Sequence, residues 1–443
     1  MFYMWYNAFV TLNLWRRNGR RIIMEWLKIV NFCVATLFTL CYAYQFFYLI
    51  VGCIKKPKSF PDTKRTNRYA ILIAARNESV VIAHLIDSIH NQSYPQELID
   101  TYVVADNCTD DTAKIAKDMG AIVYERFSEK HVGKGFALKL ALRNIFSSKG
   151  QEYYDGYFVI DADNLLDKEY VSEMDKALND GNKILTSYRN SKNYATNWIS
   201  SGYALWFMHE AKHLNNPRFI LGTSCAVSGT GFLVHRDVIN EQGGWKHFLL
   251  TEDIEFSIDH IIKGYKIGYC HKAMLYDEQP VKFSQSWRQR LRWAKGFLQV
   301  VHKYGKDLIK SIFKSSGFSA IDMLFTIAPA FFISLTGVLI NIFSVIYTAI
   351  FAREYFSTAF VEIVKLFWGI YSTLFIVGTA CGITEWKNIR ATTFKKVKSF
   401  FTFPLFMLTY LPISAVALFS RVHWAPIEHT DAVTIDDVTN STP

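Results

Sequence analysis

Long apolar runs without charged side chains occur at both ends of the chain. They cover residues 29–54, 323–352, 366–384 and 399–420. A run of about 20 apolar residues is long enough to cross the hydrocarbon core of a bilayer as a helix. We therefore expect a transmembrane helix at 29–54 and a C-terminal transmembrane region of about three spans at 319–421. Pro404 and Pro412 leave a second reading of the last run, in which it bends or stays at the membrane interface.

Between the first two runs, short apolar stretches alternate with segments of helical periodicity. The predicted strands are Tyr69–Ala75, Thr101–Ala105, Ala121–Tyr124 and Tyr157–Ile160, and the predicted helices are Glu78–Asn91, Asp110–Met119 and Gly133–Phe146. Buried parallel strands appear as short apolar runs, and the helices that connect them appear as amphipathic segments. This order predicts an α/β domain with a parallel sheet, helices on both faces, and ligands at the carboxyl ends of the strands.

The remaining segments complete the predicted organisation. Residues 1–28 are an N-terminal interfacial segment, in which Met24 is an alternative start, and residues 55–283 form the soluble domain. Five basic side chains lie in the loop at 387–398, and the positive-inside rule places this loop and the soluble domain in the cytoplasm. The polar tail at 422–443 is then expected to lie outside, provided that the last apolar run is a full span, and its acidic, Thr-rich end from Asp431 is expected to be flexible.

Charge and cysteine content narrow the class of protein. Lys plus Arg outnumber Asp plus Glu by 49 to 39, and the net charge of +10 suits an anionic membrane face or an anionic substrate. We find no basic repeat, zinc-ligand spacing or aromatic RNA-binding motif, so no nucleic acid partner is expected. The seven cysteines form no C-x-x-C pair, which argues against a disulfide framework and for a soluble part in a reducing compartment.

Three groups of carboxylates lie at or near predicted strand ends. Asp106 directly follows a strand, where a carboxylate can bind a base or a ribose, whereas turn and N-cap chemistry accounts for Thr109–Asp111. Asp161 and Asp163 follow another strand, and two such close carboxylates repel each other unless a cation lies between them. Oxygen ligands of this kind suit Mg²⁺ or Mn²⁺. The third group, Thr251–Asp253, also fits an ordinary helix start.

Two glycine-containing segments offer backbone groups to a ligand. Gly133 and Gly135 flank Lys134 at a predicted helix start, where N–H groups and a point charge favour an anion. Their spacing is not that of a Walker A loop, so a nucleoside-triphosphate hydrolase is not indicated. Residues 228–231, Ser-Gly-Thr-Gly, fit either a plain turn or a wall that a ligand approaches closely.

Residues 284–318 form a predicted interfacial helix region that joins the soluble pattern to the membrane pattern. Gln289, Arg290, Arg292 and Trp293 bring an amide, two guanidinium groups and an indole onto about one and a half helical turns. Guanidinium groups suit phosphate oxygens, and an indole can stack on the face of a sugar. The other reading is an amphipathic helix on a membrane surface, with Arg and Trp at headgroup level.

In this order the motifs resemble those of the family 2 glycosyltransferases, in particular the membrane-embedded branch that contains cellulose, hyaluronan and poly-N-acetylglucosamine synthases. The resemblance runs from about Arg68 to Tyr304. The sequence Ala-Arg-Asn-Glu at 75–78 is similar to the family's opening segment, and Gln-Ser-Tyr-Pro at 92–95 to its first-helix exit. Gln-Arg-Leu-Arg-Trp at 289–293 fits the family's Q-(Q/R)-x-R-W motif at every position.

The resemblance implies a GT-A fold, an α/β nucleotide-sugar-binding domain with a mixed, mostly parallel sheet inserted between N-terminal and C-terminal transmembrane helices. It also implies a UDP-sugar donor and Mg²⁺ or Mn²⁺ on its diphosphate. Asp106 would contact the uridine, Asp161 the nucleotide and Asp163 the metal ion, while Asp253 would be the general base of an inverting displacement. The implied donor site comprises Ala75, Arg76, Glu78, Asp106, Lys134, Asp161 and Asp163, and the implied acceptor and diphosphate site comprises Gly229, Thr230, Glu252, Gln289, Arg290, Arg292 and Trp293.

We therefore expect an integral, multi-pass plasma membrane glycosyltransferase that extends a β-linked polysaccharide from UDP-N-acetylglucosamine or UDP-glucose. One alternative is a non-processive hexosyltransferase that acts on a lipid or lipid-linked acceptor. Another is an inactive membrane scaffold or export partner, although a scaffold has no need of these acidic and basic side chains. Four spans are a small set for a polymer channel, so export would require a homo-oligomer or an export partner. A coupled transporter often keeps an ionisable residue inside its apolar runs, and these runs have none.

Overall fold

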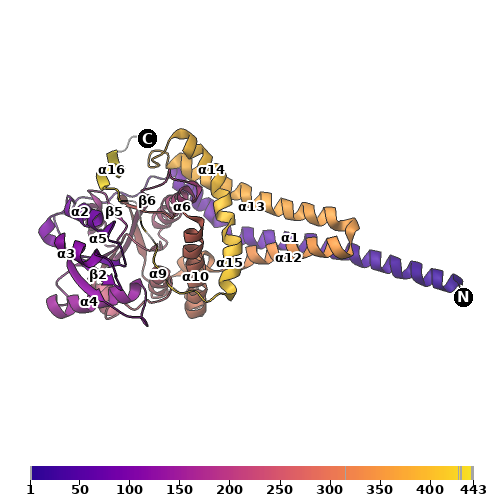
Figure 1. The fold of residues 1–443 in the computed structure, drawn as a ribbon, viewed down its shortest axis with the longest axis horizontal. Coiled ribbons are helices and arrows are strands. Elements are labelled where there is room, and N and C mark those ends of the chain that lie inside the picture. The colour runs from indigo at the N-terminus through magenta and orange to yellow at the C-terminus, as the bar shows by residue number, and fades with distance from the viewer. Residues whose placement is uncertain (1, 315, 428, 430–431, 441–443) are drawn as a thin grey trace.

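The computed structural model describes residues 2–314, 316–427, 429 and 432–440. A soluble α/β domain lies at one end of the molecule, and a narrow bundle of long helices is directed away from it (Figure 1). The predicted insertion of the α/β domain between N-terminal and C-terminal apolar helices is confirmed. The individual domain boundaries remain a prediction.

One eight-stranded sheet forms the centre of the soluble domain. Its strands are β1 (Tyr69–Ala75), β2 (Ile99–Asp106), β3 (Ile122–Arg126), β4 (Gly156–Asp161), β5 (Leu165–Leu166), β6 (Ile184–Ser191), β7 (Phe232–His235) and β8 (Ile267–Asp277), in the order β3-β2-β1-β4-β7-β6-β8-β5. The pairs β1–β2, β2–β3, β1–β4 and β6–β8 are parallel, whereas β7 runs antiparallel to β4 and β6. The expected mixed, mostly parallel sheet is therefore confirmed, and β1 has the predicted bounds.

Helices cover both faces of this sheet. They are α2 (Ile82–His90), α3 (Thr112–Asp118), α4 (Lys134–Lys149), α5 (Tyr170–Asn179), α6 (Trp198–His209), α7 (Asn216–Ile220), α8 (Arg236–Glu241), α9 (Glu252–Ile262) and α10 (Phe283–Ser311). Successive side chains of β1 enter different cores because the side-chain period of a strand is two. Leu72 belongs to the core that contains Leu138 of α4, and Ile71 to the core that contains Leu85 of α2.

The register of the sheet brings its ligand-facing edge together. Ala75 of β1 pairs with Ala105 of β2, and Ala74 pairs with Asp161 of β4. The carboxyl ends of these three parallel strands therefore lie side by side. The residues that directly follow or end them, Arg76, Asp106 and Asp161, come to the same edge.

The apolar helices flank the soluble domain in the sequence. They are α1 (Phe2–Ile54), α11 (Gly317–Ile327), α12 (Pro329–Phe351), α13 (Phe356–Thr384), α14 (Thr393–Leu408) and α15 (Tyr410–Phe419). Among the described residues, four stretches are long and apolar enough to cross a membrane, namely Met24–Ile54, Gly317–Phe351, Arg353–Thr384 and Thr393–Phe419. The helices α1, α12 and α13 form the projecting bundle, whereas α14 and α15 lie at its domain end beside α6 and α10 (Figure 1).

A buried ion pair ties the first long helix to the soluble domain. Arg218 of α7 donates to both carboxylate oxygens of Asp322 in α11, at 2.8 Å each. Tyr44 and Tyr48 of α1 donate to the same carboxylate at 2.9 and 3.0 Å. Because these four side chains satisfy one another away from water, the domain and α1 are joined by directional bonds rather than by apolar packing alone.

The C-terminal segment, defined as residues 420–427 with His429, returns to the soluble domain. Trp424 and His429 line a pocket at the carboxyl edge of the sheet. Further on, α16 (Ile435–Asn440) packs Val438 against Leu165 and Tyr276. Because these residues contact the soluble domain, the expectation that the tail lies on the opposite side of the membrane from the domain is wrong, whereas the flexibility of the end from Asp431 stays a prediction. Side-chain contacts with the domain, which the polar composition did not reveal, hold the tail beside the pocket.

Candidate active site

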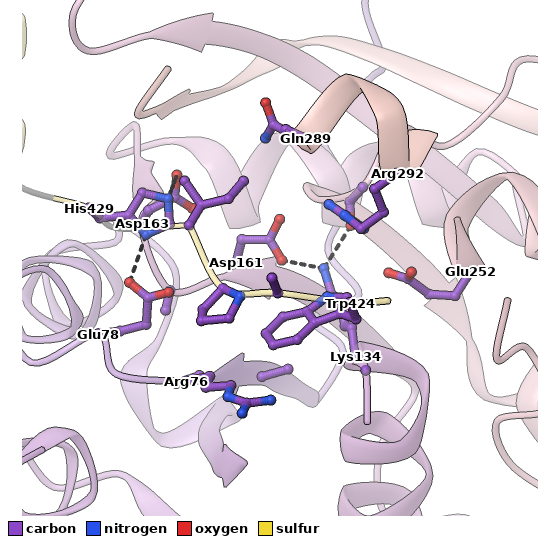
Figure 2. Close-up of a pocket in the computed structure, with 18 of the residues that line it drawn as sticks. Arg76, Glu78, Lys134, Asp161, Asp163, Glu252, Gln289, Arg292, Trp424 and His429 are labelled. Carbon is purple, nitrogen blue, oxygen red and sulfur yellow. Dashed lines mark hydrogen bonds and ion pairs between the residues drawn. The ribbon is translucent and has the colours of Figure 1, made fainter. Parts of the chain in front are cut away.

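A polar pocket opens at the carboxyl ends of β1, β2 and β4, between the start of α4, the start of α9 and the N-terminal half of α10 (Figure 2). The predicted residues that line it are Ala75, Arg76, Glu78, Asp106, Lys134, Asp161, Asp163, Gly229, Glu252, Asp253, Gln289, Arg292 and Trp293. Thr230 and Arg290 are not among the lining residues. The lining side chains come from segments more than 200 residues apart, and the topology of the sheet brings them together.

Asp106, at the end of β2, is a buried carboxylate of the pocket and is 5% exposed. Arg126 forms an ion pair with it, and the Asn107 amide donates to the same oxygen at 3.1 Å. Burial raises the pKa of Asp106, although the hydrogen bond from Arg126 opposes the shift. Asn107 has a φ of 57°, the left-handed conformation that asparagine tolerates, and this sharp turn leaves Asp106 at the strand end.

Lys134 links Asp161 to the glycine turn, defined as residues 228–231. Its ammonium forms an ion pair with Asp161 and donates to the Gly229 carbonyl at 2.7 Å. Behind the pocket wall, the Thr230 hydroxyl accepts a hydrogen bond from the Asp161 backbone N–H at 2.9 Å and donates to Asn164 at 2.5 Å. Thr230 therefore supports Asp161 from outside the pocket, which explains why it is not a lining residue.

A histidine that the sequence reading missed lies between two carboxylates. Nδ1 of His429 is 2.7 Å from Glu78, and its Nε2 is 3.6 Å from Asp163 (Figure 2). Burial opposes a charge on this ring, but Asp163 and Glu78 outweigh it and raise the pKa of His429 to about 10. Burial also raises the pKa of Glu78 to about 6. The protonated ring thus supplies the positive charge that this pair of carboxylates requires.

Two adjacent carboxylates begin α9 on the opposite wall. Burial raises the pKa of Glu252 to about 7, with a further contribution from Asp253, and burial also raises the pKa of Asp253. The glycine turn faces them: a Cβ on Gly229 would lie 3.9 Å from Asp253 Oδ2 and 3.9 Å from Arg189 Nη1. With a φ of 76°, this glycine keeps the space between the carboxylate and the guanidinium open.

The helix α10 presents three of its predicted residues to the pocket. Gln289, Arg292 and Trp293 share one face because residues three and four positions apart are neighbours on a helix. Arg292 donates to the Leu250 carbonyl at 3.0 Å, and Trp293 packs edge-on against Tyr203 with ring centroids 5.8 Å apart. These contacts fix the guanidinium and the indole before any ligand binds.

Arg290 lies on another face of α10 and is fully buried. It donates to the Phe406 carbonyl at 3.1 Å and to the Thr409 hydroxyl at 2.6 Å, at the junction of α14 and α15. The predicted contact between Arg290 and a diphosphate therefore has no support from its position. A five-residue motif does not show which of two arginines faces the ligand, because this depends on what packs against the helix.

Two further lining residues escaped the sequence reading. Arg189 at the end of β6 pairs with Asp277, donates to the Ser228 carbonyl at 3.1 Å and stacks 3.6 Å over the Phe207 ring. Trp424 lies with its ring 5.0 Å from the Arg76 guanidinium. Residues 424–427 of the C-terminal segment run along the pocket, and His429 also lines it (Figure 2). One feature of the sequence could have indicated that this segment packs against the domain: Trp-Ala-Pro-Ile at 424–427 is an apolar stretch within a largely polar tail.

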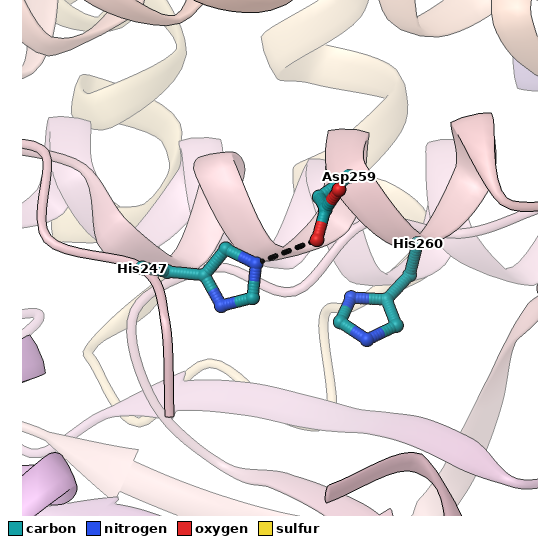
Figure 3. Close-up of side chains that lie close together, drawn as sticks. All are labelled: His247, Asp259 and His260. Atoms are coloured by element: carbon teal, nitrogen blue, oxygen red, sulfur yellow. Dashed lines mark hydrogen bonds and ion pairs between the residues drawn. The ribbon is translucent and has the colours of Figure 1, made fainter. Parts of the chain in front are cut away.

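A second cluster of titratable groups lies farther along α9 (Figure 3). His247, Asp259 and His260 offer ligand atoms within 4.8 Å of one another. However, His247 already bonds Asp259 at 3.0 Å, and the Lys263 ammonium is 2.7 Å from the same carboxylate. Because Asp259 has a cation beside it, we interpret the cluster as a brace that fastens the His247 loop to α9.

The chain is similar to known glycosyltransferases. Residues 67–296 match the family described as "Glycosyltransferase like family 2". The chain is 28% identical over 305 residues to "Probable glycosyltransferase YdaM" of Bacillus subtilis, which covers 62% of this chain and 66% of that protein. It is 26% identical over 250 residues to a "Beta-monoglucosyldiacylglycerol synthase" of Nostoc sp., covering 55% of this chain and 51% of that protein.

A third curated relative is a "Poly-beta-1,6-N-acetyl-D-glucosamine synthase" of Staphylococcus epidermidis, 23% identical over 269 residues that cover 57% of this chain and 63% of that protein. The chain thus spans about half to two thirds of the length of these relatives. Among solved structures, it is similar to the mannosyltransferase PcManGT from Pyrobaculum calidifontis in complex with GDP-Man and Mn²⁺. The TM-score is 0.53 at 14% identity, over 89% of this chain and 99% of that chain.

The structural likeness confirms the GT-A-like fold. The family match covers more than half of the 443 residues and includes β1 to β8 and the pocket-facing part of α10. This chain belongs to the glycosyltransferase like family 2.

Proposed function

We propose that this chain is a metal-dependent hexosyltransferase that moves a sugar from a nucleotide-diphosphate donor to an acceptor hydroxyl with inversion. The observation that carries the proposal is the meeting of three kinds of group in one pocket. Asp163 suits a metal ion, Asp253 suits a proton acceptor, and Arg292 suits the charge of a departing diphosphate. Proton removal, metal assistance and charge stabilisation are separate tasks that need separate groups.

The donor is assigned to the side of the pocket formed by β1, β2 and β4. Asp106 and Arg76 lie where a base and ribose would sit at the carboxyl edge of an α/β sheet. Lys134 and Asp161 form an ion pair in the same pocket, and Lys134 would face the diphosphate. We propose UDP-N-acetylglucosamine or UDP-glucose as the donor. Two observations support this donor: the resemblance to polysaccharide synthases of the family, and the cationic side chains of Lys134 and Arg292 in the pocket, which suit an anionic diphosphate.

The residues beside Asp163 fit a divalent cation. The His429 imidazole lies between Asp163 and Glu78, so a positive charge suits this point. Asp163 and a neutral His429 would provide oxygen and nitrogen ligands of the kind that Mn²⁺ accepts, with Glu78 close by. When bound, the metal would neutralise charge on the diphosphate. A protein of similar fold was solved with GDP-Man and Mn²⁺, which supports a metal ion at this site.

The acceptor is assigned to the wall formed by α9 and α10. Asp253 would take the proton of the acceptor hydroxyl while the oxygen attacks the anomeric carbon, and the bond from that carbon to the diphosphate breaks. A single displacement of this kind inverts the anomeric configuration. Burial raises the pKa of Asp253 and so strengthens it as a base. Trp293 would stack on the acceptor sugar, and Arg292 would stabilise the leaving group.

We propose a growing β-linked polysaccharide as the acceptor, with a lipid as the second candidate. The Q-R-L-R-W sequence supports the first. The arrangement of the long helices favours the second, because α1, α12 and α13 pack on one another in a narrow bundle (Figure 1). Three helices in mutual contact leave no passage for a polymer, so export would need a homo-oligomer or a partner. A lipid acceptor would remain in the membrane beside α14 and α15.

The proposed orientation places the soluble domain in the cytoplasm. Lys387 and Arg390 lie in the connection between α13 and α14, and Asn388 in the same connection donates to Tyr188 of the soluble domain at 3.5 Å. This basic connection is thus on the domain side of the bundle. The positive-inside rule then puts the domain, the pocket and the donor in the cytoplasm.

The proposal is tested by following UDP release from the purified protein in lipid vesicles with Mn²⁺. A panel of UDP-sugars is supplied, and the products are sized and extracted into organic solvent. One donor consumed, with products of many sugars, is the expected result. A single sugar on an extractable lipid would replace the polysaccharide with the second candidate. Absence of release from UDP-, GDP- and dTDP-sugars, with the protein folded, would overturn hexosyl transfer.

A further inference from the structure

The helix α10 contacts two parts of the molecule with two different faces. Gln289, Arg292 and Trp293 face the pocket. Arg290 and Ala294, four residues apart, face α14 and α15 instead. One helix therefore joins the proposed substrate site to the two helices that precede the C-terminal segment.

Arg290 closes the junction between α14 and α15. The helix is interrupted at Thr409, between α14 and α15. We attribute this to Pro412, which lacks the backbone N–H that would donate to the Leu408 carbonyl in a continuous helix. Arg290 donates to the Phe406 carbonyl and to the Thr409 hydroxyl, and its guanidinium lies 4.4 Å from the Phe406 ring centroid. The Phe406 carbonyl also accepts from the backbone N–H of Thr409 at 3.2 Å and from its hydroxyl at 2.5 Å, so the guanidinium adds a charged donor to the last turn of α14.

A second cation of α10 fixes the other end of α15. Lys295 donates to the Ala417 carbonyl at 3.0 Å, in the last turn of α15. Between these two bonds, Ile413 and Ala417 are fully buried and pack against Ala294. The helix α15 is thus held by a polar contact at each end and by apolar packing in the middle.

A short connection, residues 420–423, joins the end of α15 to the pocket. Phe419 ends α15, and Trp424 lines the pocket five residues later. Five extended residues span at most about 17 Å, so the position of α15 limits where Trp424 can lie. We propose that Arg290 is a positioning residue: it fixes the α14–α15 junction on α10 and thereby holds the C-terminal segment in the pocket.

The contacts favour an arginine over a lysine. Nη1 alone donates to both acceptors, at 3.1 and 2.6 Å, and the planar guanidinium lies 4.4 Å from the Phe406 ring centroid and 5.0 Å from that of Tyr410. A lysine ammonium is compact and strongly hydrated, so it offers no planar surface to these rings and is costlier to bury. Arg290→Lys therefore keeps the charge but loses the clamp.

Hydrogen exchange measured by mass spectrometry on the full chain in lipid vesicles tests the clamp directly. Arg290→Met, Arg290→Lys and the milder Thr409→Val are compared with Arg288→Met, which removes an exposed arginine from the same helix. We expect exchange across 410–427 to quicken about tenfold, the equivalent of about 1.4 kcal/mol of lost local stability, in the first three variants. Arg288→Met should match the wild type.

A second readout separates positioning from direct contact with the substrate. If Arg290 acts through the C-terminal segment, the clamp variants should weaken Mn²⁺ binding about tenfold, measured by electron paramagnetic resonance without nucleotide. In a His429→Gln background, Arg290→Lys should then weaken it no further. Unchanged exchange in both Arg290→Lys and Thr409→Val, with weakened UDP binding in Arg290→Lys alone, would overturn the proposal in favour of a diphosphate contact.

The link to metal binding rests on the proposed function, whereas the exchange measurement does not. If no nucleotide sugar is consumed by the wild type but exchange across 410–427 still responds to Arg290, the proposed function fails and the clamp stands. If UDP is released normally and exchange is unaffected by all three variants, the clamp fails and the proposed function stands.

Discussion

The close packing of α10 against the start of α9 gives a sharp prediction for Gly296→Ala. A Cβ at Gly296 would lie 2.5 Å from Cγ2 and 2.6 Å from Oγ1 of Thr251. Carbon atoms in comfortable contact are about 3.5–4.0 Å apart, so Thr251 must retreat by about 1 Å. Thr251 directly precedes Glu252 and Asp253, and the retreat moves the proposed base away from the acceptor.

The expected size of the effect follows from two costs. Overpacking of this kind destabilises a fold by about 1–3 kcal/mol. A reacting group displaced by about 1 Å can lose about 10²-fold in rate. We therefore expect Gly296→Ala to release UDP about a hundredfold more slowly while its melting temperature falls modestly. UDP release under saturating donor and thermal unfolding in detergent measure the two effects separately.

Two variants control this experiment. Gly305→Ala places the same methyl group on the same helix, where its nearest neighbour is Val301 Cγ1 at 3.7 Å. It should keep full activity and gain about 0.5–1 kcal/mol, because alanine is the better helix former. Thr251→Ala combined with Gly296→Ala removes the clashing atoms and should recover most of the rate. A normal rate in Gly296→Ala, or no recovery in the double variant, would refute the reasoning.

Three further outcomes are expected. Asp253→Asn should lose at least about 10²-fold in turnover, because the proposed base is lost. Its affinity for UDP and Mn²⁺, measured by calorimetry, should stay within about twofold, because the metal site is kept. A loss of UDP affinity equal to that of Asp163→Ala would contradict these roles. Burial opposes the ionisation of Asp259, but His247 and Lys263 outweigh it and hold its pKa below the ordinary value. Its stabilisation is then present above about pH 4 and lost as the pH falls further, so the melting temperature of Asp259→Asn should lie below the wild type at pH 7 and converge with it in acid; a pH-independent gap would contradict the brace. Trp424→Ala should weaken UDP binding in fluorescence titrations without changing the fold by circular dichroism, because the indole leaves the Arg76 side of the pocket; unchanged affinity would place the nucleotide elsewhere.

The fold was predictable where local pattern and burial agree. The strand Tyr69–Ala75 is apolar throughout and almost wholly buried, so its bounds followed from the sequence. The antiparallel strand β7 gave no such signal, because four residues between two sheet partners show no characteristic period. The carboxylates at strand ends were recognisable because parallel topology sends them to one edge.

The parts of the site that escaped prediction depend on long-range packing. Arg290 and Arg292 are two residues apart, and only the position of α14 and α15 shows that the first is buried while the second faces the pocket. His429 reaches Asp163 from 266 positions along the chain, within a segment whose composition is that of a mobile tail. Neither propensity nor spacing carries that information.

The buried pair of Arg218 and Asp322 has a consequence for where the reaction can occur. Because Tyr44 and Tyr48 anchor α1 to the same carboxylate, the depth of α1 in the bilayer also sets the height of the pocket above the lipid headgroups. The pocket would then lie at a fixed height above the membrane surface. Only hydroxyl groups at one distance from the bilayer surface would meet Asp253, so the membrane itself takes part in selecting the acceptor.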